Sequence, residues 1–456
     1  MNESPIVQIQ GSSLEGDASP DAAAAPAARG LSLRSNFAWV LTGNVGYAVC
    51  QWGMIVALAR LGSSFLVGQF SLGLAIATPV LMFANLHLRA MQATDAKGLY
   101  RFAEYRRLRI FTTLAAMAVI AGVAWFGDRD RRTAPIILAV AVAKGMEALS
   151  DIYYGLFQLN DRLDQIGQSM MLRGFGSLIA LSAGLYLTHS LFWGCVGMAV
   201  VSLGTLLFFD CRPRDFMTRA EARPIPHRGL HRQWNLMWMA LPLGIVTTLA
   251  SINLNMPRYF IHAQLGEHQL GVYSALAYAT VAITLVSDSL GHCAIPRMSR
   301  LYADRRLGEF RAFLIGLLGL GAALGLTGLL AAKLIGAQLL AIVYGPEYAA
   351  QSGVFTLLML ATAIHCVASA FTSGIMSARR FRIQVPLYAL MAGSNALACA
   401  LWVPAAGLTG GAKAMVLAAV VRLVLAAAIV ASLVWMPLRS ARPLQASCVE
   451  NWKPEL

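Results

Sequence analysis

Two stretches of sequence decide the fold of this 456-residue chain: LGSSFLVGQFS at residues 61–71 and LGEHQLGVYS at residues 265–274. The second stretch repeats the first with one residue fewer. Each copy joins the first and second long apolar runs of its own half of the chain. A repeat placed in this way predicts two equivalent halves with the same orientation in the membrane.

The segments around the repeat have the composition of lipid-embedded helices. The residue types AVILMFWYC make up 57% of the sequence and charged residues only 13%. An apolar run of about 20 residues crosses a hydrocarbon core, and there the backbone must be hydrogen-bonded within its own segment, which requires a helix. We expect spans at 36–59, 66–89, 108–126, 133–158, 170–188, 191–209, 234–262, 270–293, 310–332, 351–376, 383–402 and 413–436. This pattern predicts an all-α membrane protein of twelve transmembrane helices, in two six-helix lobes related by a parallel repeat around a central cavity.

The basic residues predict how the chain is oriented in the membrane. When the loops between these spans are assigned to alternate sides, 27 of the 36 Lys and Arg residues fall on one side and six on the other, while three lie within spans. Loops rich in Lys and Arg stay in the cytoplasm. We therefore expect a multi-pass protein of the bacterial inner membrane with both termini cytoplasmic.

The predicted domain organisation follows from the spans. Residues 1–30 read as a disordered cytoplasmic tail without a signal peptide, 31–210 as the N-lobe and 211–233 as a basic cytoplasmic linker; 234–436 form the C-lobe and 437–456 a cytoplasmic tail. The net charge of +14 does not indicate nucleic-acid binding, because the basic residues flank membrane helices and no basic soluble domain is present.

Three charged residues occupy one face of the fourth span. Lys144, Glu147 and Asp151 follow the spacing i, i+3 and i+7. Ionisable groups at membrane depth are costly, and they face a partner or an aqueous cavity. Two interpretations remain open for Lys144: it lines a substrate cavity, or Glu147 neutralises it locally.

Two arginines are predicted to share the cavity wall with Lys144. Arg258 lies in the seventh span and Arg422 in the twelfth. With Lys144 they predict a cationic cavity suited to a phosphate or diphosphate, since guanidinium groups bind such anions with two hydrogen bonds. Local pairing of both arginines is the alternative.

Acidic and helix-weakening residues suggest how transport is driven and gated. Glu147, Asp151 and Asp288 are candidates for binding a coupling proton or sodium ion, although Asp151 and Asp288 are equally compatible with solvated or capping roles. The lone His365 is more typical of a hydrogen-bonded packing residue than of a switch. The repeat also aligns two pairs in the first helix of each lobe, Gln51 with Asn255 and Gly53 with Pro257, which are candidate cavity-facing and hinge positions.

Several signatures are absent from the sequence. It contains no phosphate-binding loop, no G-x-S-x-G, no H-E-x-x-H and no C-x-x-C. We therefore predict no catalytic residues, no metal site and no cofactor. The close spacing of Gly321 and Gly325 predicts tight helix packing.

Several motifs resemble bacterial polysaccharide repeat-unit flippases of the O-antigen and exopolysaccharide type. They are NFAW at 36–39, GNVGY at 43–47, VGQF at 67–70, FANLHLR at 83–89, SDIYYGLFQ at 150–158 and YGPEY at 344–348. These flippases belong to the multidrug, oligosaccharidyl-lipid and polysaccharide exporter superfamily. The related peptidoglycan-precursor flippases usually have fourteen helices, so twelve favours the polysaccharide branch.

The resemblance implies a transporter of undecaprenyl-pyrophosphate-linked oligosaccharides, moving them from the cytoplasmic to the periplasmic leaflet. It also implies a polysaccharide polymerase and a chain-length regulator as partners. A cation-coupled multidrug efflux antiporter of the same fold is the alternative, but an acidic cavity would be expected for it. A polymerase or ligase is disfavoured because the loops opposite the basic side are short.

Overall fold

The computed structural model describes residues 33–95, 99–127, 133–212, 229–378 and 383–435, and these residues are helical with short connections. The predicted tails, 1–30 and 437–456, lie outside them, as does most of the linker 211–233. In chain order, the helices of the first half are α1 Leu33–Leu61, α2 Ser64–Asn85, α3 Leu88–Thr94, α4 Phe102–Phe126, α5 Ala134–Leu159, α6 Leu163–Thr188, α7 Leu191–Gly204 and the π-helix η1 Thr205–Asp210. Those of the second half are α9 Gly229–Ala279, α10 Val281–Ala303, α11 Leu307–Val343, α12 Pro346–Ala349, α13 Ser352–Ser377 and α14 Gln384–Trp435.

Glycines divide the two longest helices into separate membrane spans. Gly266 in α9 has φ 79° and Gly407 in α14 has φ 58°, conformations that side-chain-bearing residues rarely adopt. Each helix reverses direction there, so α9 and α14 both contain parts of two spans. Counted in this way, the described helices form twelve segments: α1, α2, α4, α5, α6, α7 with η1, the two parts of α9 (the second continued by α10), α11, α13 and the two parts of α14. The expected twelve-helix architecture is therefore confirmed.

Eight of the described helices are apolar and long enough to cross a membrane by themselves, with α14 counted once. Helix α5 is not among them, because Lys144, Glu147 and Asp151 interrupt its apolar sequence. Its place among the spans follows from its packing instead: α5 lies inside the N-lobe in contact with α2, α4 and α7.

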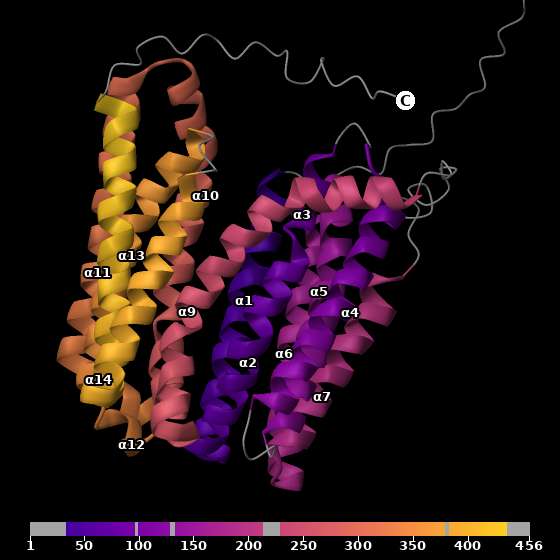
Figure 1. Cartoon of the computed structure of the whole chain (residues 1–456), viewed down its shortest axis with the longest axis vertical. Helices are drawn as coiled ribbons and strands as arrows, with labels where there is room; N and C mark the ends of the chain where they lie inside the picture. Colours follow the sequence, from indigo (N-terminus) through magenta and orange to yellow (C-terminus); the bar gives the residue numbers. More distant parts are fainter. Residues whose placement is uncertain (1–32, 96–98, 128–132, 213–228, 379–382, 436–456) are drawn as a thin grey trace, which may run out of the picture.

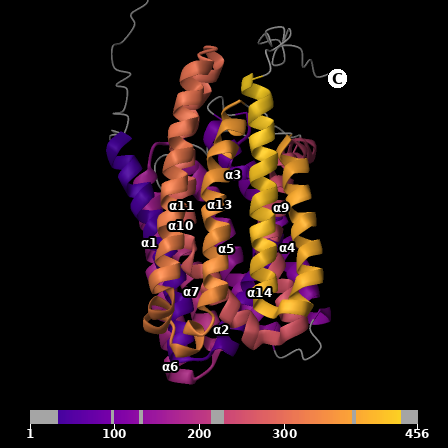
Figure 2. The same ribbon diagram turned by 90° about the vertical axis from the view of Figure 1, so that its left-hand side faces the viewer.

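Figure 1 shows two helical lobes that touch at the lower end and diverge toward the upper end. We call the upper end the basic end, because it carries residues 99–101, 160–162 and 304–306, which belong to the side predicted to be rich in Lys and Arg. The lower end, with residues 62–63, 189–190, 266, 344–345 and 407, is called the distal end. Figure 2 shows α11, α13 and α14 running nearly parallel through the C-lobe.

The two copies of the repeat pack against each other at the distal end. Gly68 and Gly271 are equivalent positions once the one-residue gap is placed. A Cβ atom at Gly68 would overlap the carbonyl oxygen of Glu267, and one at Gly271 would overlap that of Ser64. Only glycine permits α2 and α9 to cross this closely. In the C-lobe, Gly321 and Gly325 meet the backbone of α13 in the same way, which confirms the expected tight packing.

Helix α9 does not stay within the C-lobe. Its segment Gln233–Leu241 is bent by 49° from Gly244–Ala279 and lies across the basic end of the N-lobe (Figure 1). Leu236 and Ala240 are fully buried there, in a cluster with side chains of α3, α4 and α5. Residues of the predicted C-lobe therefore pack against the N-lobe, across the domain boundary that the sequence predicts at residue 233.

Candidate functional site

The first polar cluster at membrane depth joins α1 to α5. Lys144 Nζ lies 2.8 Å from Glu147 Oε2 and donates to the Tyr47 hydroxyl at 3.0 Å. Tyr47 in turn donates to Glu147 Oε2 at 2.7 Å, and Gln51 Nε2 donates to Tyr47 at 2.7 Å. These contacts match the local-pairing interpretation of Lys144. The cluster is not sealed, because the Glu147 side chain is 32% exposed.

Helix packing brings Tyr47 to this position. Helix α1 lies close against α6, where a Cβ atom at Gly43 would be 2.6 Å from the Cα atom of Gly167. Gly53 takes part in the same contact: a Cβ atom there would be 3.3 Å from Leu178 Cδ2. Helix α1 is one continuous helix through Gly53, so in this conformation the position is a packing contact.

Asp151 belongs to a separate group at the basic end of the N-lobe. Its carboxylate pairs with Arg89 at 3.3 Å and with the fully buried Arg109 at 3.1 Å. Arg109 also donates to Asn85. Two cations therefore neutralise Asp151, and these contacts fit a structural role better than ion coupling.

One buried ion pair was not predicted from the sequence. Arg173 Nη2 on α6 lies 3.0 Å from Asp210 Oδ2 in η1, and both side chains are almost completely buried. Arg173 also donates to Tyr154 at 3.2 Å. The available signal was an arginine inside the fifth predicted span and an aspartate directly after the sixth, which periodicity alone does not place side by side.

The C-lobe contains a chain of three residues from three helices. Arg422 Nη1 on α14 lies 2.8 Å from His365 Nδ1 on α13, and His365 Nε2 lies 3.2 Å from Asp288 Oδ1 on α10. Arg422 also donates to the Thr372 hydroxyl at 3.2 Å, and Ser369 donates to Asp288 at 3.0 Å. The structure thus brings together the predicted cation Arg422, the candidate coupling residue Asp288 and the histidine between them.

Arg258 forms the third polar cluster, within α9. Its Nη1 donates to Asn255 Oδ1 at 2.7 Å, and its guanidinium lies 5.2 Å from the centre of the Tyr278 ring. Pro257 faces Gly411 of α14, and α9 is helical on both sides of it up to Gly266. The aligned residues Gln51 and Asn255 therefore each touch the cationic cluster of their own lobe, Gln51 through Tyr47.

The predicted cavity residues are distributed between the lobes and do not form one contact network. Lys144 belongs to the α1–α5 cluster and Arg422 to the α10–α13–α14 cluster, and no hydrogen bond or ion pair between described residues joins them. Their depth is similar: Lys144 is well inside α5, His365 is near the middle of α13, and Arg422 is far from both ends of its α14 segment.

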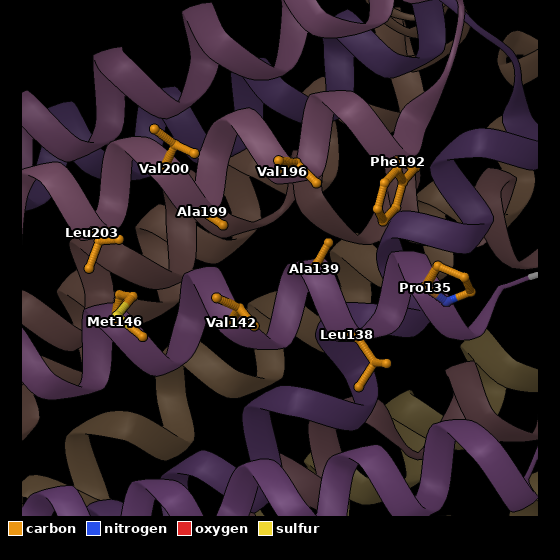
Figure 3. Close-up of a pocket in the computed structure, with 10 residues that line it drawn as sticks. All are labelled: Pro135, Leu138, Ala139, Val142, Met146, Phe192, Val196, Ala199, Val200 and Leu203. Carbon is orange, nitrogen blue, oxygen red and sulfur yellow. The ribbon is translucent and has the colours of Figure 1, made fainter.

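A groove between α5 and α7 has an entirely different character. Its volume is about 450 Å³ and its lining is entirely apolar. Figure 3 shows Met146, Val142 and Ala139 of α5 facing Leu203, Ala199 and Val196 of α7. Such a surface suits acyl chains and offers nothing to a charged headgroup. Among the described residues, no group of His, Cys, Asp and Glu is arranged to hold a metal ion.

Polar contacts between the lobes gather at the distal end. Trp52 Nε1 donates to the Tyr344 hydroxyl at 2.7 Å, Ser64 donates to Glu347 at 2.9 Å, and Thr133 donates to Glu267 at 2.5 Å. Arg60, at the end of α1, donates to the last carbonyls of α11. Burial raises the pKa of the nearby Tyr348 phenol, and the charge of Glu347 raises it further.

Comparison with solved structures identifies the fold. The chain matches the lipid II flippase MurJ in an inward closed conformation with a TM-score of 0.64 and 10% identity, over 86% of this chain and 87% of that one. It matches the inward-facing conformation of a multidrug resistance MATE family transporter of the MOP superfamily with a TM-score of 0.57 and 14% identity, over 86% and 95%. The chain has the fold of these transporters.

One curated relative adds sequence similarity. The capsular polysaccharide biosynthesis protein CapF of Staphylococcus aureus is 24% identical over 315 residues, which cover 69% of this chain and 78% of the relative. No family model matches the sequence.

Proposed function

We propose that this protein is a flippase that moves undecaprenyl-pyrophosphate-linked oligosaccharide repeat units from the cytoplasmic to the periplasmic leaflet, for assembly of a surface polysaccharide. The MOP-type fold supports a transporter, and the similarity to a capsular polysaccharide biosynthesis protein supports this cargo. In this proposal the protein lies in the bacterial inner membrane with the basic end toward the cytoplasm. It delivers the repeat units to a polysaccharide polymerase and its chain-length regulator.

The observation that carries the proposal is the state of the two C-lobe arginines. Arg258 and Arg422 are buried at membrane depth, and within the described residues neither is paired with a carboxylate. The Nε atom of each is also buried without a described partner. A cation in this position costs several kcal/mol or more in the absence of a counter-ion. An anionic cargo supplies one, and a diphosphate accepts the paired N–H groups of a guanidinium.

Partial exposure of acidic residues at the same depth supports an aqueous interior. The Asp288 and Glu147 side chains are 46% and 32% exposed. Charged groups in membrane proteins face water or a partner and avoid lipid. We infer that both carboxylates border a wet space that the cargo headgroup enters. Such a space also gives a coupling proton or sodium ion access to Asp288.

The multidrug alternative fits these charges less well. A site for cationic drugs requires a carboxylate without a neutralising partner, but Glu147 is paired with Lys144 and Asp151 with two arginines. In the described part of the C-lobe, the carboxylate of Asp288 contacts His365 and Ser369, but two guanidinium groups at the same depth, those of Arg258 and Arg422, lack an acidic partner, so the net charge there is positive. Normal surface polysaccharide together with increased drug sensitivity in a deletion strain would favour the drug exporter over the flippase.

A complementation experiment tests the proposal. Deletion of the gene should trap lipid-linked repeat units in the cytoplasmic leaflet and abolish surface polysaccharide, and the wild-type gene should restore it. Arg422→Gln and Arg258→Gln should each restore less than about a tenth of it, on the scale of a lost charge-assisted contact. Lys333→Gln, on the exposed face of α11, is the matched control and should restore it fully. Full export by both arginine variants at equal membrane levels would remove the basis of the proposal.

A further inference from the structure

The hydrogen bonds around His365 fix which of its nitrogens carries a proton. A guanidinium has only donors, so His365 Nδ1, at 2.8 Å from Arg422 Nη1, must present its lone pair. Nε2 faces the carboxylate Asp288 Oδ1 at 3.2 Å and must carry the hydrogen. The imidazole is therefore neutral while Arg422 remains in this position.

Arg422 and a second proton compete for the same nitrogen. A proton on Nδ1 would place an N–H group and a second positive charge directly against the guanidinium. His365 can thus become an imidazolium only after Arg422 Nη1 has moved away. Asp288 would stabilise the imidazolium, because it already accepts the Nε2 hydrogen and is held in place by Ser369 at 3.0 Å.

Other groups around His365 leave this competition undisturbed. The charged groups that act on the imidazole are Arg422 and Asp288. On the α11 side, α13 packs against Gly321, Gly325 and Gly328, which carry no charge. The adjacent Cys366 is buried, and the Tyr388 ring contacts Arg422 from α14.

We propose that Arg422 and His365 form a linked anion and proton site, in which capture of the cargo diphosphate by Arg422 leads His365 to take up one proton. A diphosphate oxygen replaces His365 Nδ1 as the acceptor of the Arg422 N–H group. The freed Nδ1 then binds a proton from water, and the imidazolium keeps its Nε2–H contact with Asp288. This inference rests on the proposed function, because it names the anion of that cargo as the group that displaces Arg422.

Linkage makes the effect reciprocal: protonation of His365 releases Arg422 and strengthens anion binding by the same factor. The partial exposure of His365 and Asp288, 28% and 46% for their side chains, gives the proton a route to the site. The proton also offsets one negative charge of the cargo inside the membrane.

The test measures proton uptake by the full-length protein in lipid nanodiscs. Farnesyl diphosphate serves as the probe, and calorimetric titrations in two buffers with different ionisation enthalpies give the protons bound per probe. The wild type should take up between one half and one proton near pH 7. His365→Asn, whose amide oxygen still accepts from Arg422, should bind the probe with no proton uptake. Binding by the wild type without proton uptake would overturn the inference and leave the flippase proposal intact.

A second measurement needs no ligand. At pH 8 a free imidazole lone pair attacks diethyl pyrocarbonate, and the carbethoxylated fraction of His365 is quantified by peptide mass spectrometry. Arg422→Gln should increase the labelling of His365 several-fold, whereas Thr372→Val, which removes the hydrogen bond from Arg422 to the Thr372 hydroxyl, should change it little. Equal labelling of wild type and Arg422→Gln would also overturn the inference. Linked proton uptake in a protein that fails to restore polysaccharide export would instead count against the proposed function.

Discussion

Single residues in the N-lobe show how charge is kept inside an apolar protein. Arg173 and Asp210 neutralise each other in a nearly water-free position. Such a pair contributes little compared with an apolar replacement, but loss of one partner leaves an unpaired buried charge. The two members therefore have to be considered as a unit.

We expect Arg173→Ala to destabilise the protein by about 3–5 kcal/mol, because the buried Asp210 carboxylate would lose the guanidinium that lies 3.0 Å from it. The double variant Arg173→Met with Asp210→Leu should recover most of this loss. Arg306→Ala, which breaks an exposed pair with Glu309, is the control and should cost less than about 1 kcal/mol. Thermal unfolding in detergent measures all three, and equal midpoints for Arg173→Ala and Arg306→Ala would contradict the expectation.

Mutagenesis can distinguish the two interpretations of Lys144, contact with the cargo and local pairing with Glu147. If pairing with Glu147 is its role, Lys144→Gln leaves a partly buried carboxylate, and the double variant with Glu147→Gln relieves it. We expect the single variant to reduce surface polysaccharide more than the double variant does, at equal protein levels. A double variant as defective as the single one would show that Lys144 itself contacts the cargo.

Sequence distance decides which contacts could be predicted at this scale. Lys144 and Glu147 are three positions apart on one helix, so their contact follows from helical periodicity. His365 is separated by 77 positions from Asp288 and by 57 from Arg422. Each was recognised as an ionisable residue at membrane depth, but their meeting depends on how α10, α13 and α14 pack, and periodicity carries no information about that.

At the scale of the element, glycine determines how closely helices approach. Gly68 and Gly271 bring α2 and α9 into backbone contact where the lobes meet. The repeat predicted that the two segments are equivalent, and the structure adds that they pack against each other. A side chain at either position must push the lobes apart at the distal end.

Gly271→Val should therefore weaken the contact between the lobes. We expect a wider spin-label distance across the distal end, and reduced polysaccharide export. Gly122→Val on α4 is the matched control, since a Cβ atom there has no neighbour within 4 Å. An unchanged distance distribution in Gly271→Val would show that the helix crossing does not hold the distal end closed.

Also at the scale of the element, the apolarity of a segment does not by itself identify every span or its packing. Helix α5 was predicted from its length and apolar flanks, even though three charges on one face lower its apolar character. The breaks at Gly266 and Gly407 fall between the predicted spans 234–262 and 270–293 and between 383–402 and 413–436. The turn of α9 over the N-lobe was not predicted, because Leu236 and Ala240 are equally compatible with a lipid-facing position.

For the whole molecule, the distribution of contacts indicates the conformational state. Polar contacts between the lobes concentrate at the distal end, through Trp52, Ser64 and Arg60, while the lobes diverge toward the basic end (Figure 1). In alternating access, such a structure is closed on the distal side, and the distal contacts must break before cargo can leave there. The contacts of Trp52, Ser64 and Arg60 join the N-lobe to the segment from α11 to α12, and that of Thr133 joins it to Glu267 of α9.

A covalent link between α2 and α12 at the distal end should stop transport at one step of the cycle. In a background without the native cysteines, Ser64→Cys and Glu347→Cys replace two residues whose side chains touch at 2.9 Å. A short bismaleimide that joins them should block polysaccharide export while cargo still binds from the basic side, because only distal opening is prevented. Either single cysteine variant treated with the same reagent is the control and should keep its export. Normal export by the cross-linked protein would mean that the cargo passes without separation of α2 from α12, and the two-lobe mechanism would have to place its exit elsewhere.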